Sequence, residues 1–359
     1  MLVDLARVAD GVGLDMLVIS IMCSDDSPYA AQLVDLGVEV VDLARTGRWD
    51  PRALALAVRV LRRWQPDVIH SHLKHADMVG AFAARRLGVP LVSTLHIIED
   101  RTGLLGRFKR RTAAAARMST AARTVAVSEA QRRWYIATFR VDPGSVVTVH
   151  NGVQDVTGLS PGQRSALRSS LGVDPDTALC LNVGIMRPGK GQADLLTALS
   201  LLPEDLPLQV VLVGDGPLRP ALEAQAAAAG LLPARVHFAG FRRDVGALLV
   251  AGDLVVSTSW SEALPTVLLQ ALAAGRATVA TEVGGVPEVV TAEEAILVPV
   301  RDAQQLAGAL RTLALDGELR SRLGVAARAR FENRFTVLQW AQRLHVLYLD
   351  VLTKQPHGR

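Results

Sequence analysis

The stretch "ALCLNVGIMRPGKGQADLLTALSLL", residues 178–202, contains the pattern that decides the fold. It begins with a short apolar run, passes through a turn that contains three glycines, and continues with the apolar spacing of a helix. A continuously apolar strand followed by a helix is typical of a parallel sheet that is covered on both faces. The stretch therefore predicts one strand-turn-helix unit of a doubly wound α/β domain.

The same alternation recurs along most of the chain. In the C-terminal half, further strand patterns lie at 208–214, 235–241, 253–259 and 276–283. In the N-terminal half, they lie at 14–22, 38–43, 66–72, 90–96, 123–128 and 145–153. We therefore expect two doubly wound parallel-sheet (Rossmann-like) domains that face a cleft at the carboxyl ends of their strands. After Asp302 the pattern is helical to the end of the chain.

A turn-rich segment separates the two halves. Residues 158–177 contain two glycines and a proline near their start, then another glycine and proline, which predicts a linker. The expected divisions are an N-terminal domain at 1–157, the linker, a C-terminal domain at 178–335, and a C-terminal helix at 336–359. We expect that helix to pack back on the N-terminal domain.

Composition narrows the class of protein. The chain has 359 residues, 50% of them hydrophobic, without an apolar run long enough to cross a membrane and without a signal-peptide pattern at its start. Two cysteines provide neither a disulfide framework nor a zinc spacing. These features predict a cytoplasmic protein, and we expect no nucleic-acid partner.

Positive charge is concentrated in one segment. Residues 101–140 hold ten Lys and Arg residues against a single acid, Glu129. Such a segment attracts phosphate or anionic lipid, although a solvated helix face explains it equally well. The candidate contacts to an acceptor or to the inner face of the plasma membrane are Arg107, Lys109, Arg110 and Arg111.

Three strand ends carry residues suited to an anionic ligand. Gly184 ends the first strand of the C-terminal half, and Arg187 and Lys190 follow in a glycine-rich turn before a helix, an arrangement that suits a diphosphate. A plain turn is the competing interpretation. Gly214 lies in a second sharp turn, and Gly240, Phe241 and Arg242 end a third strand, where a nucleobase has room.

The segment "SEALPTVLLQ", residues 261–270, adds a carboxylate and a helix start. Glu262 precedes the helix and can accept hydrogen bonds from hydroxyl groups. The backbone amides of the residues that start the helix can face an anion, and Gln270 lies within the helix. The helix-start residues are Leu264, Pro265, Thr266 and Val267.

These motifs, in their order, resemble the retaining nucleotide-sugar glycosyltransferases of family 4, which have the two-domain GT-B architecture. The resemblance rests on "VGIMRPGKG", "LVGDGPLR", "FAGFRRDV", "SEALPTVLLQALAAG" and "VGGVPEVV", and in the N-terminal half on "VIHSHLKHADMVGAFAARRLGVPLVSTLH", "VAVSEAQRR" and "VVTVHNGV". It covers nearly the whole chain.

The resemblance implies a role for individual residues. Lys190 would hold the donor diphosphate, Glu262 would contact hydroxyl groups of the sugar, and the amides after it would meet the distal phosphate. Gln270 would meet the ribose. His96 matches a histidine that lies beside the reacting sugar, so Glu262 and His96 are the catalytic candidates.

Three departures from the family pattern stand out. Ile185 occupies the position where family members carry arginine, with Arg187 two positions on. Gln270 replaces the second acid of the family signature. The first fifteen residues have the apolar spacing of a helix but no N-cap signal before it. Family members have a strand and a glycine-rich loop upstream of such a helix. We therefore expect the first strand and that loop to be missing.

The resemblance implies a hexosyltransferase that moves a sugar from a UDP- or GDP-linked donor to a lipid-linked saccharide, with retention of configuration, in envelope or exopolysaccharide biosynthesis. A partner subunit with a weakened site and a nucleotide-sugar epimerase are the alternatives. His70, His72 and His75 lack a carboxylate or cysteine that would complete a metal-ligand spacing. We therefore predict no cofactor and no metal.

Overall fold

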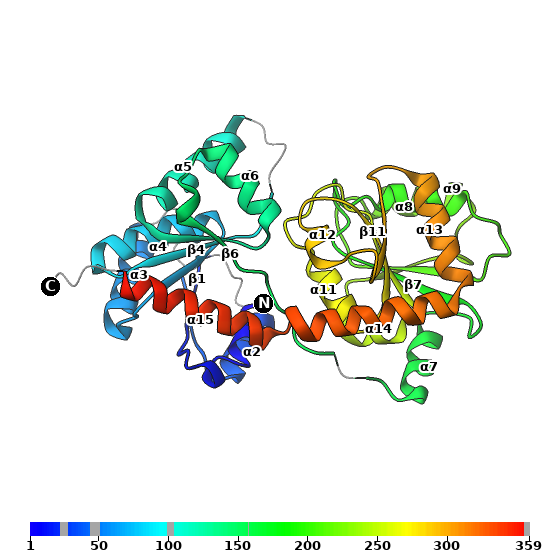
Figure 1. Ribbon diagram of the computed structural model, residues 1–359, viewed down its shortest axis with the longest axis horizontal. Helices are drawn as coiled ribbons and strands as arrows, with labels where there is room; N and C mark the ends of the chain where they lie inside the picture. The colour runs from blue at the N-terminus through cyan, green and yellow to red at the C-terminus, as the bar shows by residue number, and fades with distance from the viewer. Residues whose placement is uncertain (22–27, 44–50, 99–103, 157, 355–359) are drawn as a thin grey trace. The chain divides into compact units, whose positions relative to one another are not determined.

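The computed structural model describes residues 1–21, 28–43, 51–98, 104–156 and 158–354. It contains two compact units (Figure 1). Unit 1 comprises Met1–Gly152 and Val337–Arg359, and unit 2 comprises Val153–Thr336.

Unit 2 is built on one six-stranded sheet in the order β12-β11-β10-β7-β8-β9, and every pair of neighbours runs parallel. Cys180 on the central strand pairs with Val210 on one side and Leu254 on the other. The strands are β7 (Ala178–Val183), β8 (Leu208–Val213), β9 (Val236–Gly240), β10 (Leu254–Ser257), β11 (Ala277–Thr281) and β12 (Ala295–Val298).

Helices cover both faces of this sheet. The helices are α7 (Pro161–Ser170), α8 (Gln192–Ser200), α9 (Arg219–Ala228), α10 (Val245–Ala251), α11 (Thr266–Ala273), α12 (Val286–Val289), α13 (Ala303–Leu315) and α14 (Gly317–Arg334). Ala178 and Cys180 of β7 join a core with α8, α9 and α13, whereas Leu179 and Leu181 join a second core with α10 and α11. The prediction of a doubly wound domain from the apolar strand pattern is confirmed.

Half of the segment expected to be a linker is helical. Pro161 starts α7, and Ser160 caps it with a capping box that includes Gln163. On its inner side Leu167 packs into the same core as Leu248 and Leu249 of α10. The turn residues at the start of this segment mark the N-terminus of a helix rather than a spacer, and unit 2 therefore begins well before β7.

The described part of unit 1 holds six parallel strands in two sheets, β1-β2 and β3-β4-β5-β6. The strands are β1 (Leu17–Ser20), β2 (Glu39–Asp42), β3 (Ile69–His72), β4 (Leu91–Leu95), β5 (Ala121–Ala126) and β6 (Val146–Thr148). The helices are α1 (Leu2–Ala6), α2 (Pro28–Asp35), α3 (Pro51–Trp64), α4 (Lys74–Leu87), α5 (Leu104–Thr120), α6 (Glu129–Phe139) and α15 (Val337–Thr353).

The last helix supplies a large part of the core of unit 1. Trp340 and Leu344 of α15 are buried against Leu5 of α1, Val92 of β4 and Val125 of β5. Residues from both ends of the sequence therefore share one hydrophobic core.

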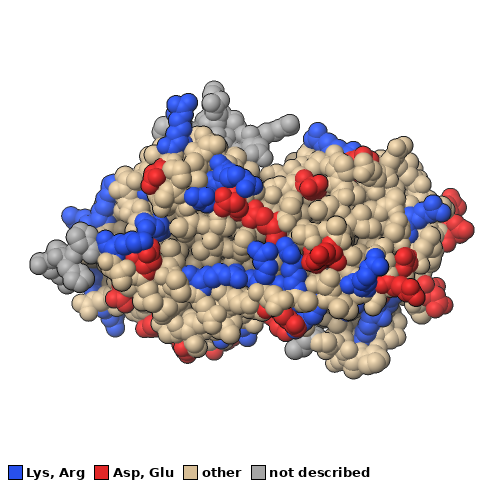
Figure 2. All heavy atoms as spheres, in the orientation of Figure 1, with Lys and Arg blue, Asp and Glu red and all other residues tan. Residues whose placement is uncertain are grey.

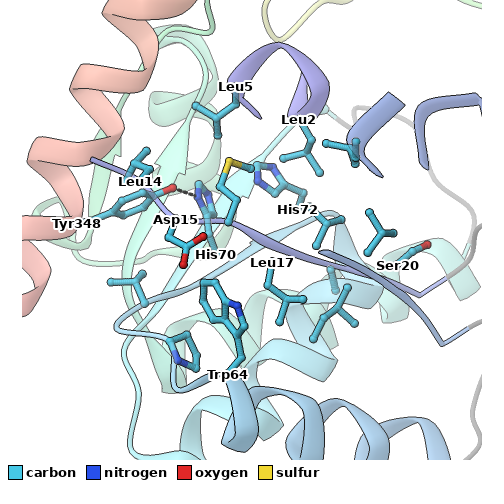
Figure 3. Close-up of a pocket in the computed structure, with 18 of the residues that line it drawn as sticks. Leu2, Leu5, Leu14, Asp15, Leu17, Ser20, Trp64, His70, His72 and Tyr348 are labelled. Atoms are coloured by element: carbon cyan, nitrogen blue, oxygen red, sulfur yellow. Dashed lines mark hydrogen bonds between the residues drawn. The ribbon is translucent and has the colours of Figure 1, made fainter. Parts of the chain in front are cut away.

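A cavity of about 1000 Å³ lies between the two sheets of unit 1 (Figure 3). Among the described strands, β1 bonds only to β2, and β3 on that side of its own sheet has no bonded neighbour. Residues 17–20 of β1, His70 and His72 of β3, Leu2 and Leu5 of α1, and Tyr348 of α15 line the cavity. The facing edges of β1 and β3 are thus not hydrogen-bonded to each other, and the cavity lies between them.

None of the helices in the described part of the chain is both long enough and apolar enough to span a bilayer.

A close helix contact in unit 2 gives a stability prediction. A Cβ added at Gly324 of α14 would overlap the carbonyl oxygen of Gly275, which follows α11. We expect Gly324→Ala to lower the free energy of unfolding by about 1–3 kcal/mol, because overpacking forces the backbone to shift. Thermal and urea unfolding of the purified chain measure this change.

The matched control is Gly308→Ala in α13, where a Cβ meets nothing within 4 Å. That change should stabilise the helix by about 0.5–1 kcal/mol, because alanine loses less backbone freedom on folding. Equal effects of the two substitutions would contradict the steric argument.

Candidate active site

Glycines let several loops meet at the carboxyl ends of the unit 2 strands. Gly191, with φ +69°, caps α8, and a Cβ there would overlap the backbone carbonyl of Thr258. Gly214, with φ +134°, lies equally close to the carbonyl of Gly184. Only glycine combines these dihedral angles with such close approach. The loops after β7, β8 and β10 are therefore held against one another.

This arrangement brings Lys190 and Glu262 together. Lys190 Nζ donates to Glu262 Oε1 at 2.5 Å, and the two side chains are 24% and 13% exposed. Thr258 Oγ1 also donates to the carbonyl of Lys190 at 3.1 Å. The two charged residues that the sequence assigned to the nucleotide-sugar donor thus form an ion pair with each other.

The backbone of Glu262 is held from the other side by the turn after β11. Gly285 N donates to the carbonyl of Glu262 at 3.0 Å. A Cβ on Gly284, whose φ is +50°, would overlap the same carbonyl oxygen. The loop that carries the carboxylate is therefore fixed, and movement at this point is left to the side chain.

The N-terminus of α11 comes shortly after Glu262 in the sequence. Pro265 is its N-cap residue and forms no side-chain cap, while the amides of Thr266 and Val267 lie in the first turn, where helices have no carbonyl partner of their own. Leu264 and Pro265 are buried. Gln270 is half-buried, and its amide makes no hydrogen bond to a described residue. The first turn can therefore offer amides to an anion.

The expected nucleobase position is only partly available. Gly240 has φ +66°, and Phe241 is 66% exposed at the end of β9. The guanidinium of Arg242, however, donates to both carboxylate oxygens of Asp244, at 2.8 and 2.6 Å. Phe241 is consequently free to contact a base, whereas the charge of Arg242 is already neutralised.

Ile185, which departs from the family pattern, and Arg187 two positions on are both exposed. Ile185 is half-exposed, and Arg187 is exposed and forms no ion pair with a described residue. Arg187 is therefore a cation that an anionic ligand can recruit without breaking an existing pair.

Sequence reasoning missed Trp260. Its backbone N donates to the carbonyl of Gly189 at 2.8 Å, and its Nε1 donates to Asp194 Oδ2 at 2.6 Å. The guanidinium of Arg301 lies 4.0 Å from its ring centroid. Trp260 therefore ties the glycine-rich turn to the loop of Glu262. A tryptophan two positions before that acid was the available signal.

In unit 1, His96 follows β4 and lies within a cluster of histidines. His72 Nδ1 and His96 Nε2 share a hydrogen bond at 2.9 Å, and His70 stacks on His72 with 4.4 Å between ring centroids. His70 in turn bonds to Tyr348 at 2.6 Å and to Thr94 at 2.7 Å (Figure 3). His96 is thus the end of a chain of hydrogen-bonded and stacked rings that begins on α15.

Burial keeps these histidines neutral. It lowers the pKa of His96 to about 4, and the carboxylate of Asp77 only partly opposes this effect. Burial, followed by the charge on His96, lowers the pKa of His70 to about 3, and the pKa of His72 is also well below its usual value. His96 can therefore give or take a hydrogen bond near neutral pH but carries no positive charge there.

A second buried network, absent from the sequence-based predictions, lies next to His96. Arg117 Nε donates to Asp77 Oδ2 at 2.9 Å, and both side chains are buried. Ser71 and Ser93 donate to the other carboxylate oxygen at 2.7 and 2.5 Å, and Arg117 Nη1 donates to Tyr135 at 3.1 Å. These bonds give both carboxylate oxygens of Asp77, and Nε and Nη1 of Arg117, hydrogen-bond partners within the core.

The buried pair also changes the interpretation of the basic segment. Arg117 is one of its ten cations but is not on the surface, and Arg123 and Arg132 pair with Asp350 and Glu129. Arg111 is exposed on α5. The side chains of Arg107, Lys109 and Arg110 lie outside the described part of the structure.

Charge on the described surface is mixed. Figure 2 shows Lys and Arg side chains interspersed with Asp and Glu over the visible face. Within the described residues, no group of three or more His, Cys, Asp and Glu side chains could hold a metal ion.

Comparison with known families matches both halves of the chain. Residues 163–330 match the model described as "Glycosyl transferases group 1", and residues 1–155 match "Glycosyltransferase Family 4". A D-inositol 3-phosphate glycosyltransferase of Saccharomonospora viridis is 30% identical in an alignment of 317 positions that covers 80% of this chain and 70% of that protein. The chain belongs to the group 1 glycosyltransferases.

Two further similarities support the family assignment. The alpha-maltose-1-phosphate synthase of Mycolicibacterium smegmatis is 30% identical in an alignment of 311 positions that covers 79% of this chain and 79% of that protein. The structure of Anabaena HepE in complex with UDP and glucose is 25% identical, with a TM-score of 0.85 over 97% of this chain and 95% of that one. This group 1 glycosyltransferase therefore has the GT-B fold. The predicted roles of individual site residues stay predictions.

The histidine cluster gives a pH prediction for this glycosyltransferase. An unfolded histidine takes up a proton near pH 6.5, whereas folded His70 resists protonation down to about pH 3. The free energy of unfolding of unit 1 should therefore fall as the pH drops below 6.5. Because one side of the ring faces the cavity, we expect His70→Gln to reduce the loss between pH 7 and pH 5 by about 1 kcal/mol rather than by the full linkage value.

Urea unfolding at the two pH values measures this difference. His237→Gln, at an exposed position of β9, is the matched control for the loss of an imidazole. If His70→Gln lost as much stability as the unmodified chain, His70 would not be the group responsible.

Proposed function

We propose that this protein transfers a hexosyl group from a UDP- or GDP-linked sugar to a lipid-linked saccharide acceptor, with retention of configuration and without a metal. Envelope or exopolysaccharide biosynthesis at the cytoplasmic face of the membrane is the setting that suits such an acceptor.

The observation that supports a nucleotide-sugar donor most directly is the meeting of opposite charges beside a helix start. Lys190, Glu262 and the first turn of α11 come from neighbouring strand ends of unit 2. A cation and free amides suit a departing diphosphate, and a carboxylate suits hydroxyl groups of the sugar. These groups can stabilise the developing charge of a leaving diphosphate without a metal ion.

The relatives favour UDP over GDP as the first donor to test. HepE is described in complex with UDP and glucose, and also with UDP-glucose. Phe241 is exposed at a strand end where a uracil or guanine ring could stack, so this residue does not discriminate between the two bases.

The acceptor has two candidates. The basic segment of the sequence favours a lipid-linked acceptor at an anionic membrane surface, which it would approach through Arg107, Lys109, Arg110 and Arg111. The name of the Saccharomonospora relative instead indicates a phosphorylated small molecule, D-inositol 3-phosphate. A phosphorylated acceptor would also be attracted by a basic segment, so the two candidates need a direct test.

A weakened partner subunit and a nucleotide-sugar epimerase are the alternatives in function. Gln270 and Ile185 favour the partner subunit, because both replace a charged residue of the family pattern with an uncharged one. The motif order of family 4 argues against the epimerase.

A donor panel tests the proposed function. The chain is incubated with UDP- and GDP-hexoses and with acceptor fractions, and released nucleoside diphosphate and sugar products are measured. We expect release of nucleoside diphosphate that depends on acceptor. Interconversion of the donor sugar would identify an epimerase, and binding without turnover would identify a partner subunit.

Variants of the same panel separate the two positions of the signature. Glu262→Ala should lower kcat by about 100-fold or more, the scale expected when a group that stabilises developing charge is removed. Gln270→Glu should alter the donor KM more than kcat, because a charged acceptor strengthens a ribose hydrogen bond. Gln304→Glu, at an exposed position of α13, is the matched control. A large gain in kcat from Gln270→Glu would contradict the assignment to the ribose.

Vesicle binding tests the membrane part of the proposal. Changing Arg107, Lys109, Arg110 and Arg111 to Ser should weaken binding to anionic vesicles by at least about tenfold, since each basic residue near such a surface contributes about 1 kcal/mol. Vesicles of neutral lipid and the change of Arg59, Arg62 and Arg63 to Ser on α3 are the controls. Unchanged binding to anionic vesicles would exclude this segment as the membrane contact.

A further inference from the structure

The ion pair between Lys190 and Glu262 presents a conflict within the donor site. Both residues have a role in the proposed function, and each neutralises the charge of the other. The ammonium of Lys190 has three N–H donors, so a diphosphate can bind it beside the carboxylate, but the two anions then compete for a single positive charge. At Lys190 the donor therefore competes with an existing ion pair.

Hydrogen bonds hold the backbone around both residues, so the loops of Lys190 and Glu262 cannot easily move apart. The turn of Lys190 is tied to the loop after β10 through Thr258 and Trp260, which bond to the carbonyls of Lys190 and Gly189. The loop of Glu262 is held by the hydrogen bond from Gly285. Only the two side chains are free to rearrange, and the carboxylate has to stay in the neighbourhood of the bound diphosphate.

The consequence differs between a nucleotide sugar and a nucleoside diphosphate. With the sugar present, hydroxyl groups can donate to the carboxylate and replace the N–H bond from Lys190. Without the sugar, the carboxylate has to share its cationic partner with the diphosphate, gains no hydroxyl donor, and lies close to the negative charge of the diphosphate. Two like charges in a partly buried site repel each other more strongly than in bulk water.

We propose that Glu262 determines specificity for the sugar-bearing nucleotide, because it competes with the diphosphate for Lys190 whenever no sugar is bound. This role rests on the proposed function and goes beyond the hydroxyl contact assigned to Glu262. The same competition weakens the binding of the nucleoside diphosphate after transfer. Glu262 thereby favours release of the product that shares the donor's nucleotide.

The test is the affinity of the full chain for UDP and for UDP-glucose, measured by calorimetry, with and without the carboxylate. We expect Glu262→Gln to bind UDP about five- to tenfold more tightly than the unmodified chain, and UDP-glucose no more tightly. Glu262→Ala should show the same gain for UDP. Glu318→Gln, at an exposed position in the first turn of α14, removes one negative charge elsewhere in unit 2 and should leave the affinity for UDP unchanged.

A double-variant cycle identifies the partner. In a Lys190→Gln background, Glu262→Gln should give a smaller gain in UDP affinity, because the competition for the ammonium no longer exists. A full-sized gain in that background would show general repulsion and would overturn the role of Lys190.

The remaining outcomes are distinct. Equal or weaker binding of UDP by Glu262→Gln and Glu262→Ala, with unchanged thermal unfolding, would overturn the specificity role while leaving the nucleotide-sugar donor in place. No binding of UDP, GDP or their sugars by any form of the chain would overturn the donor and the specificity role together.

Discussion

The candidate donor site depends on close backbone contacts that only glycine permits. Gly191 lies against Thr258, Gly214 against Gly184, and Gly284 against Glu262, each with a positive φ. These contacts hold the loops after four strands of one parallel sheet at fixed separation. Lys190 and Glu262 are 72 positions apart in sequence and still meet at 2.5 Å. The positions of the two charged residues therefore depend on the absence of a side chain at these glycines.

The fold was largely predictable from periodicity, because both faces of the four inner strands of unit 2 are buried and leave a continuous apolar run. Local composition misled at residues 158–177, where a capping box and a proline at the helix start resembled a linker. The open space between β1 and β3 had no signature in either strand, since pairing between strands depends on neighbours that a single strand does not specify.

The sequence predicted which residues form the site but not how they interact with one another. Lys190 and Glu262 were expected to act on a ligand, and only the structure shows that they form an ion pair with each other. Arg242 and Arg117 were counted as available cations, yet Asp244 and Asp77 neutralise them. Asp244 is two positions from its partner, whereas Asp77 is 40 positions from Arg117, so only the first pairing was within reach of sequence reasoning.

The place of α15 in unit 1 has a consequence for biosynthesis. Trp340 and Leu344 are buried with Leu5 and Val92 in one core, although more than two hundred residues of unit 2 and its flanks are translated between them. A nascent chain on the ribosome has therefore made most of unit 1 long before it can close that core. Unit 2 is continuous in sequence, whereas unit 1 cannot complete its core until its last segment, α15, has been made.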